Sequence, residues 1–267
     1  MGSLLKVEFS RAFRSLGFAV AIGVGIVICC WHFWENIYPL RNCVYVGPYP
    51  LSAFGKWIGG ENTSLQGVLY YMMVPILCAL PYAESYFFDL KSGYINQITM
   101  RCGKKQYVRA KYIVTFVSGA VTAICPLLFD FLLTGMVLPA VVPQRGFGVF
   151  PIDADMLMAE LYYSKPFIYH LMYFILDAVF LGLLNIIALI AVHFTENRFL
   201  VMLMPFLVYL FVFSVCQMLG VGQFCPAGYL RPSQMFISSW YIIAGELLLL
   251  LASGGVFLYV DTKKEDI

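Results

Sequence analysis

Six long apolar stretches, separated by polar segments, divide the chain of 267 residues. Each stretch has about 18 residues or more, which is enough for a helix to cross a hydrocarbon layer of about 30 Å. The pattern therefore predicts an all-α, polytopic membrane protein whose residues 1–267 form a single transmembrane domain. The six predicted spans cover about residues 16–33, 65–82, 112–138, 167–192, 199–219 and 236–260.

The segment before the first span, residues 3–14, has an amphipathic helical pattern. Leu5 and Phe9 are one helical turn apart, whereas Lys6 and Arg11 fall on the other face. Such a pattern favours a helix that lies in the headgroup plane with its cations near anionic lipid. In the alternative interpretation, these residues are only the positive flank of the first span.

The first span, residues 16–33, follows cations as the apolar part of a signal peptide does. No small-x-small cleavage site comes after it, so we interpret it as an uncleaved anchor. Within it, Ala19 and Gly23 are four positions apart, a spacing of small residues that lets another helix approach closely. A chance pair in a glycine-rich span is the alternative.

The segment between the second and third spans, residues 81–112, is the most basic part of the chain. It contains six of the seventeen Lys and Arg residues. We expect the helix to break near Gly93 and to present a short amphipathic element that lies on lipid or docks on a partner. A positive loop that only orients the spans is the alternative. The expected apolar face consists of Phe87, Leu90, Tyr94 and Ile98.

The cations are divided unevenly between the two sides of the predicted topology. The side that carries the termini has twelve Lys and Arg residues, and the other side has five. Because cytoplasmic segments are enriched in Lys and Arg, we expect a multi-pass protein of the cell membrane with both termini in the cytoplasm. The five cations expected outside are Arg41, Lys56, Arg145, Lys165 and Arg231.

The overall composition supports a membrane protein. The chain is 61% hydrophobic and 12% charged, with a mean hydropathy of +0.81. Soluble domains are about 45–50% apolar and about 25% charged, so a single soluble core could not bury this much apolar surface. With a net charge of only +2, we expect the lipid bilayer, and no nucleic acid, as its surroundings.

The chain has none of the common catalytic motifs. It contains no GxxxxGK[ST] phosphate-binding loop, no HExxH and no GxSxG. The eight cysteines and three histidines have no metal-ligand spacing. We therefore expect neither an enzyme nor a bound metal or cofactor. A disulfide between Cys43 and Cys225, both in segments predicted to lie outside, is left open.

Three acidic residues, Asp130, Asp177 and Glu246, lie inside predicted spans that contain no Lys or Arg. A charge inside the bilayer is costly, so such residues usually face the bundle interior, form pairs or line a polar path. The three acids are candidates for a substrate path. Alternatively, they are protonated hydrogen-bonding groups or couple transport to protons.

The order of these parts resembles the membrane permease subunits of the type-2 ATP-binding-cassette exporter family. Those proteins have an amphipathic N-terminal helix, six spans and a cytoplasmic segment between spans two and three. The lead-in Pro81-Tyr82-Ala83 is also similar to permeases of Gram-positive bacteria. The segment is similar to the family's acidic–glycine–basic–Tyr/Lys pattern at Glu84, Asp89, Gly93, Arg101, Tyr107 and Lys111.

The resemblance implies a coupling helix within residues 84–105 that docks on a separate ATPase subunit. ATP and magnesium would bind in that ATPase, and a second permease chain, identical or different, would complete the pathway. It implies export of a peptide, lipid-like or drug-like substrate from a bacterial cell. The family pattern does not include the three acids. The implied docking residues are Asp89, Tyr94, Ile98, Arg101, Lys104 and Lys105.

Two other functions remain open. An ion-coupled secondary transporter would use the three acids, although the chain has no inverted repeat of the kind such transporters have. A membrane scaffold or immunity protein would bind its partner without transporting anything.

Overall fold

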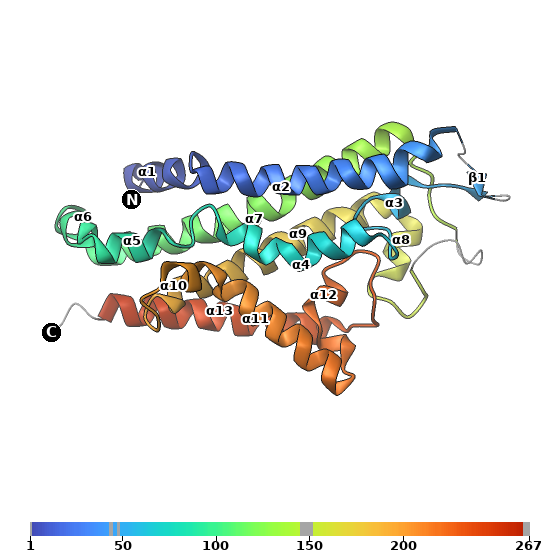
Figure 1. Ribbon diagram of the computed structural model, residues 1–267. Coiled ribbons are helices and arrows are strands. Elements are labelled where there is room, and N and C mark those ends of the chain that lie inside the picture. The colour runs from blue at the N-terminus through green and yellow to red at the C-terminus, as the bar shows by residue number, and fades with distance from the viewer. Residues whose placement is uncertain (1, 43–44, 47–48, 145–151, 264–267) are drawn as a thin grey trace.

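The computed structural model describes residues 2–42, 45–46, 49–144 and 152–263. The described chain is a bundle of helices that run side by side (Figure 1), so the predicted all-α fold is confirmed. Its only described strands are β1 (Tyr45–Val46) and β2 (Tyr49–Pro50), a short antiparallel pair.

Most helices lie along the bundle axis, and short ones occupy its ends (Figure 1). Helix α7 packs against α9, α2, α4 and α13, and therefore lies at the centre. The helices are α1 (Gly2–Phe13), α2 (Leu16–His32), η1 (Phe33–Ile37), η2 (Tyr38–Asn42), α3 (Ala53–Lys56), α4 (Leu65–Ala79), α5 (Ser85–Lys91), α6 (Tyr94–Cys102), α7 (Lys104–Val137), α8 (Ala159–Ser164), α9 (Pro166–Asn185), α10 (Ile187–Ala191), α11 (Arg198–Leu219), η3 (Gly222–Phe224), α12 (Pro226–Tyr229) and α13 (Trp240–Lys263).

Five helical segments are long and apolar enough to cross a membrane, which agrees with a multi-pass protein. The predicted second span, residues 65–82, is shorter, because α4 has 15 residues and ends at Ala79. At about 1.5 Å per residue, α4 is shorter than the hydrocarbon layer. The five segments are Leu16–Asn42, Lys104–Val137, Pro166–Ala191, Arg198–Leu219 and Trp240–Thr262.

The third span begins earlier than its apolar pattern predicts. Helix α7 starts at Lys104 rather than near residue 112, so the basic run forms its first two turns. Lys, Arg, Gln and Ala are good helix formers, and this explains why the polar residues continue the helix. Gly103, with a φ of 73°, separates α7 from α6.

The two ends of the bundle differ. Helices α1, α5 and α6 and the last turn of α13 lie at one end, called here the terminal end (Figure 1). Helices α3, α8 and α12 lie toward the opposite end, called here the loop end. The basic segment, α1 and the last turn of α13 are thus on the same side of the bundle, as the predicted topology requires.

Helix α1 forms where the amphipathic pattern predicted it, but its buried face is centred on Glu8 rather than on Phe9. Leu4, Glu8 and Ala12 are buried, whereas Leu5 and Phe9 are only partly covered. This face packs on α7, so α1 is held by protein contacts as well as by any lipid contact.

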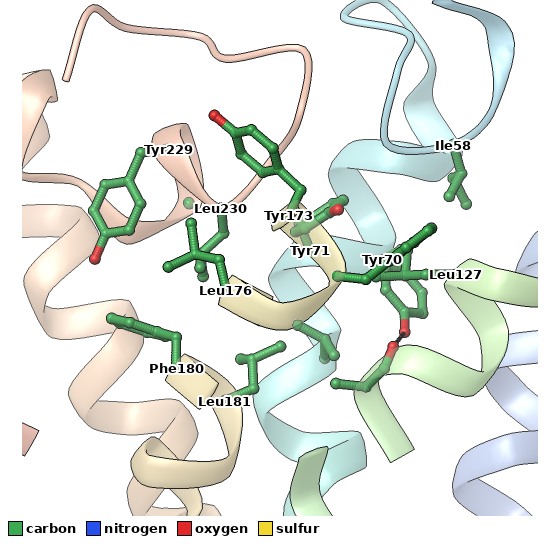
Figure 2. Packing of buried hydrophobic residues seen from close by; sticks show 14 of the residues in the cluster. Ile58, Tyr70, Tyr71, Leu127, Tyr173, Leu176, Phe180, Leu181, Tyr229 and Leu230 are labelled. Carbon is green, nitrogen blue, oxygen red and sulfur yellow. Dashed lines mark hydrogen bonds between the residues drawn. The ribbon is translucent and has the colours of Figure 1, made fainter. Parts of the chain in front are cut away.

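Tyrosine hydroxyls satisfy carbonyl groups inside the bundle. Pro75 has no N–H group, so the carbonyl of Tyr71, four residues earlier, loses its helical partner. The Tyr209 hydroxyl donates a hydrogen bond to that carbonyl at 3.1 Å. Figure 2 shows a second case, in which the Tyr70 hydroxyl donates to the Ala123 carbonyl at 2.6 Å. The apolar cluster in Figure 2 therefore contains satisfied polar groups.

The small residues of α2 that face the bundle are not the predicted pair. Ala19 and Gly23 are exposed, and a Cβ atom added to Gly23 would meet no atom within 4 Å. Ala21 and Gly25 are buried instead. A Cβ atom on Gly25 would lie 2.4 Å from Cγ of Pro126, so only glycine allows α2 this close to α7.

Replacing Gly25 with valine is therefore expected to destabilise the protein by about 1–3 kcal/mol, the usual cost of overpacking a close contact. The matched control is Gly23→Val on the open face of the same helix, which should leave stability unchanged. Thermal unfolding of both variants in detergent micelles measures the difference. Equal midpoints for the two variants would contradict the close α2–α7 contact.

Candidate functional site

The terminal end contains the segment that the sequence singled out. Helices α5 and α6 are joined through Ser92 and Gly93, and the left-handed φ of 71° at Gly93 turns the chain there. The predicted break near Gly93 is confirmed. The predicted continuous apolar face is wrong, because Phe87 is buried while Leu90 is exposed. A left-handed residue interrupts the helical spacing on which that face depended.

Asp89 of α5 is the centre of a buried polar network. Arg11 of α1 holds its carboxylate with two hydrogen bonds, of 2.9 Å from Nη2 and 3.1 Å from Nη1. Lys111 of α7 lies 2.6 Å from Oδ2, and the Tyr107 hydroxyl donates to the same oxygen at 2.5 Å. Three helices therefore meet at one carboxylate.

Glu8 of α1 extends this network. Its Oε2 atom lies 3.1 Å from Nζ of Lys111 and accepts a hydrogen bond from the Tyr82 hydroxyl. Arg11 lies 3.2 Å from the same carboxylate. Glu8 and Lys111 have no exposed surface. Two acids thus balance two bases, and we call Glu8, Arg11, Tyr82, Asp89, Tyr107 and Lys111 the anchor network.

The anchor network shifts the pKa of Asp89. Burial by itself would raise the pKa of this carboxyl, but the hydrogen bonds from Arg11 and the charge of Lys111 more than offset it and lower the pKa. The hydrogen bond to Asp89 in turn raises the pKa of Arg11. Both groups are held in their charged forms.

Sequence reasoning missed this network. It placed Asp89 on a docking surface, whereas only 3% of Asp89 is exposed. It also counted Lys111 among the cations of the basic cytoplasmic segment, whereas Lys111 is fully buried. One signal was present in the sequence, because Glu8 falls four residues from both Leu4 and Ala12 and so shares their helical face.

The other predicted docking residues lie near the surface at the terminal end. Arg101 and Lys105 are exposed, and Tyr94, Ile98 and Lys104 are partly exposed. Beside them, an open depression of about 420 Å³ is lined by Arg11, Phe88, Asp89, Ser92 and Tyr94. We define the α5–α6 surface as Phe88, Ser92, Tyr94, Met100 and Arg101 together with Lys105, which lies at the start of α7.

Asp130 lies in a second buried network near the loop end. Its Oδ1 atom lies 3.0 Å from Nδ1 of His32, and its Oδ2 atom accepts the backbone N–H of Ile58 at 2.7 Å. Glu61 lies 3.8 Å from the other ring nitrogen of His32 and 2.6 Å from Lys56. The sequence did not identify a partner for Asp130. In the structure this partner is His32, which belongs to another helix, α2.

The other two acids have separate partners. Asp177 is fully buried and accepts a 3.3 Å hydrogen bond from the Tyr71 hydroxyl, while its Oδ1 atom has no partner among the described residues. Glu246 is partly exposed and accepts a 2.5 Å hydrogen bond from Tyr229. Because no two of the three acids share a partner, the structure does not join them into one polar path.

The described residues contain no group of three or more His, Cys, Asp or Glu side chains that could hold a metal ion. For the disulfide left open above, Cys43 lies outside the described residues, and Cys225 is buried.

Comparisons with known protein families, curated proteins and solved structures find no match for this chain. The class is therefore defined by the fold alone. It is an α-helical protein with five helical segments able to cross a membrane, and its basic end carries a surface helix pair held by buried charges.

Replacing Lys111 with methionine is expected to destabilise the protein by about 3–5 kcal/mol, because it leaves the buried Glu8 and Asp89 carboxylates without their shared cation. The control is Lys105→Met, the same change at an exposed position of the same helix, and it should leave stability unchanged. Thermal unfolding in micelles compares the two. A Lys111→Met midpoint equal to that of the control would show that the anchor network contributes no stability.

The lowered pKa of Asp89 predicts a loss of stability in acid. The unfolded chain binds a proton at Asp89 near its ordinary pKa of about 3.9, and the folded protein binds it only at lower pH. The stabilisation is thus present above about pH 4 and is lost as the pH falls through the lowered value. In Arg11→Gln, the Asp89 pKa rises toward its ordinary value, so the acid-dependent loss of stability should be smaller than in the wild type.

Unfolding midpoints measured from pH 6 down to pH 3 test this dependence on acid. Arg14→Gln, which removes an exposed neighbouring cation, is the control and should follow the wild-type curve. If Arg11→Gln also followed that curve, Arg11 would not control the protonation of Asp89.

Proposed function

We propose that this chain is the permease subunit of an ATP-binding-cassette exporter and that a separate ATPase subunit docks on the α5–α6 surface. The observation that carries the proposal is the contrast between the two sides of α5. Phe88 is exposed on one side, while Asp89, the next residue, is bound on the other side to α1 and α7. A partner that moves the surface would therefore also move the bundle.

The chemistry of the α5–α6 surface suits a protein partner. Phe88 and Met100 offer exposed apolar side chains, and Arg101 and Lys105 add cations beside them. Stable interfaces combine apolar anchors with a polar rim. We expect the ATPase to present an apolar groove with acidic residues at its edge.

The anchor network offers a route for the motion. Asp89 is tied to Lys111, in the second turn of α7, and α7 continues as one helix to Val137 near the loop end. Displacement of α5 by an ATPase would thus act on the central helix of the bundle. Near the other end of α7, Asp130 is bonded to α2 and to the segment that contains Ile58.

In this proposal α4 is a sixth, shorter span, and the terminal end faces the cytoplasm. The excess of cations at that end supports this orientation. ATP and magnesium bind in the ATPase, and a second permease chain completes a pathway for a peptide, lipid-like or drug-like substrate. The bilayer is that of a bacterial cell membrane.

Co-purification with an ATP-binding-cassette ATPase encoded beside this chain tests the proposal. Met100→Asp is expected to abolish retention of the ATPase and its stimulation, because it places a charge in the apolar part of the α5–α6 surface. The matched control is Met218→Asp at the far end of α11, since both methionines are 87% exposed. This variant should retain the ATPase.

Two results would contradict the proposal. In one, the intact chain never associates with such an ATPase. In the other, Met100→Asp and Met218→Asp retain it equally well, so that docking does not use α6. Transport in vesicles driven by a pH gradient without any ATPase would instead support an ion-coupled transporter.

A further inference from the structure

Arg231 is a buried cation near the loop end, in the segment that follows α12. Only 1% of it is exposed. Its Nη2 atom donates to the Glu61 carbonyl at 2.6 Å and lies 3.4 Å from Oγ of Ser64. Its Nε and Nη1 atoms have no hydrogen-bond partner among the described residues. Two of its three donor nitrogens are therefore unused.

Arg231 also forms no ion pair within the part of the chain that the structure describes. The ion pairs of the described residues all join acids to cations other than Arg231. The Glu61 side chain, for example, pairs with Lys56 and His32. Burial lowers the pKa of Arg231, and the charge of Glu61 offsets this only in part. An isolated buried charge is unfavourable unless it is paired and hydrogen-bonded.

A cavity of about 120 Å³ lies against this side chain. Apart from Arg231, its wall is mainly apolar and comes from α4, α11, α12 and the segment that follows α12. Gln217 and Met235 on its lining are exposed, so the cavity opens at the surface of the bundle. The apolar wall includes Val68, Met72, Phe213, Met235 and Phe236.

We propose that this cavity binds the head group of an anionic amphiphile, a molecule with one carboxylate or phosphate on an apolar chain. The guanidinium group matches both anions in shape and charge, and it would gain the ion pair that the described residues do not supply. The apolar wall would take the first carbons of the chain, and the rest would leave through the opening. A free ion would leave that wall unused.

This site does not depend on the proposed docking of an ATPase. Helix α12, which Arg231 follows closely in the chain, lies toward the loop end, whereas α5 and α6 lie at the terminal end (Figure 1). The ligand could be a lipid of the surrounding bilayer or an amphiphile that arrives from solution. Both present the same chemistry to Arg231, and the experiment distinguishes them.

The test uses the full chain in nanodiscs of zwitterionic phosphatidylcholine, titrated with decyl phosphate and with decanoate. Both are expected to bind, whereas decyltrimethylammonium and inorganic phosphate are expected to bind at least tenfold more weakly. Arg231→Gln should weaken decyl phosphate binding by about ten- to hundredfold, the usual effect of losing a hydrogen bond to a charged group.

A second variant keeps Arg231 in place, in case its replacement prevents folding. Val68→Trp fills the cavity from α4 and should weaken decyl phosphate binding at least tenfold. Its control is Val27→Trp on an exposed position of α2, which should bind like the wild type. Nanodiscs that contain phosphatidylglycerol then identify the source. If phosphatidylglycerol competes with decyl phosphate, the ligand is a lipid of the bilayer. If it does not compete, the ligand is an amphiphile from solution.

Three results would overturn the inference. Equal binding of decyltrimethylammonium would show that Arg231 does not select the charge. Equal binding of inorganic phosphate would show that the apolar wall is not used. Unchanged binding of decyl phosphate in Val68→Trp would show that the cavity holds only water.

Discussion

The structure depends on one buried group of ion pairs, in which Glu8 and Asp89 both bind the single ammonium group of Lys111. Each of these residues comes from a different helix, so α1, α5 and α7 can assemble only together. A partial assembly would leave a charge without its partner in an apolar environment, which costs several kcal/mol. The network therefore specifies how the terminal end is built, and it joins a surface segment to the central helix.

The same rule explains the polar groups along the rest of the bundle. Where Pro75 removes a backbone donor, the Tyr209 hydroxyl supplies one. Where α7 buries Asp130, His32 and the Ile58 N–H form hydrogen bonds to its carboxylate. Each of these pairs joins different helices or a helix and a loop. The polar residues of this apolar protein thus help to determine which helices are neighbours, together with close contacts such as that of Gly25 with Pro126. Arg231 stands out because its pairing is incomplete.

Much of the fold could be predicted from hydrophobic patterning, because a run of about 20 apolar residues has few alternatives to a membrane helix. The five long spans and the N-terminal helix were found in this way. The residues at which the helices begin and end were less predictable. Helix α7 begins at Lys104 because its polar residues also favour helix, and α4 ends at Ala79. Neither boundary coincides with a change in hydropathy.

The sequence by itself determined the class, the helical elements, the concentration of positive charge in one segment and the break at Gly93. These depend on local composition and on backbone conformation, which short stretches specify. Only the tertiary structure decided that Asp89 and Lys111 face inward and that Gly25 rather than Gly23 meets a neighbour. It also decided that Arg231 lies buried without an ion pair among the described residues. Those outcomes depend on which side chains from distant parts of the chain come together, and charge and hydropathy read along the sequence do not contain that information.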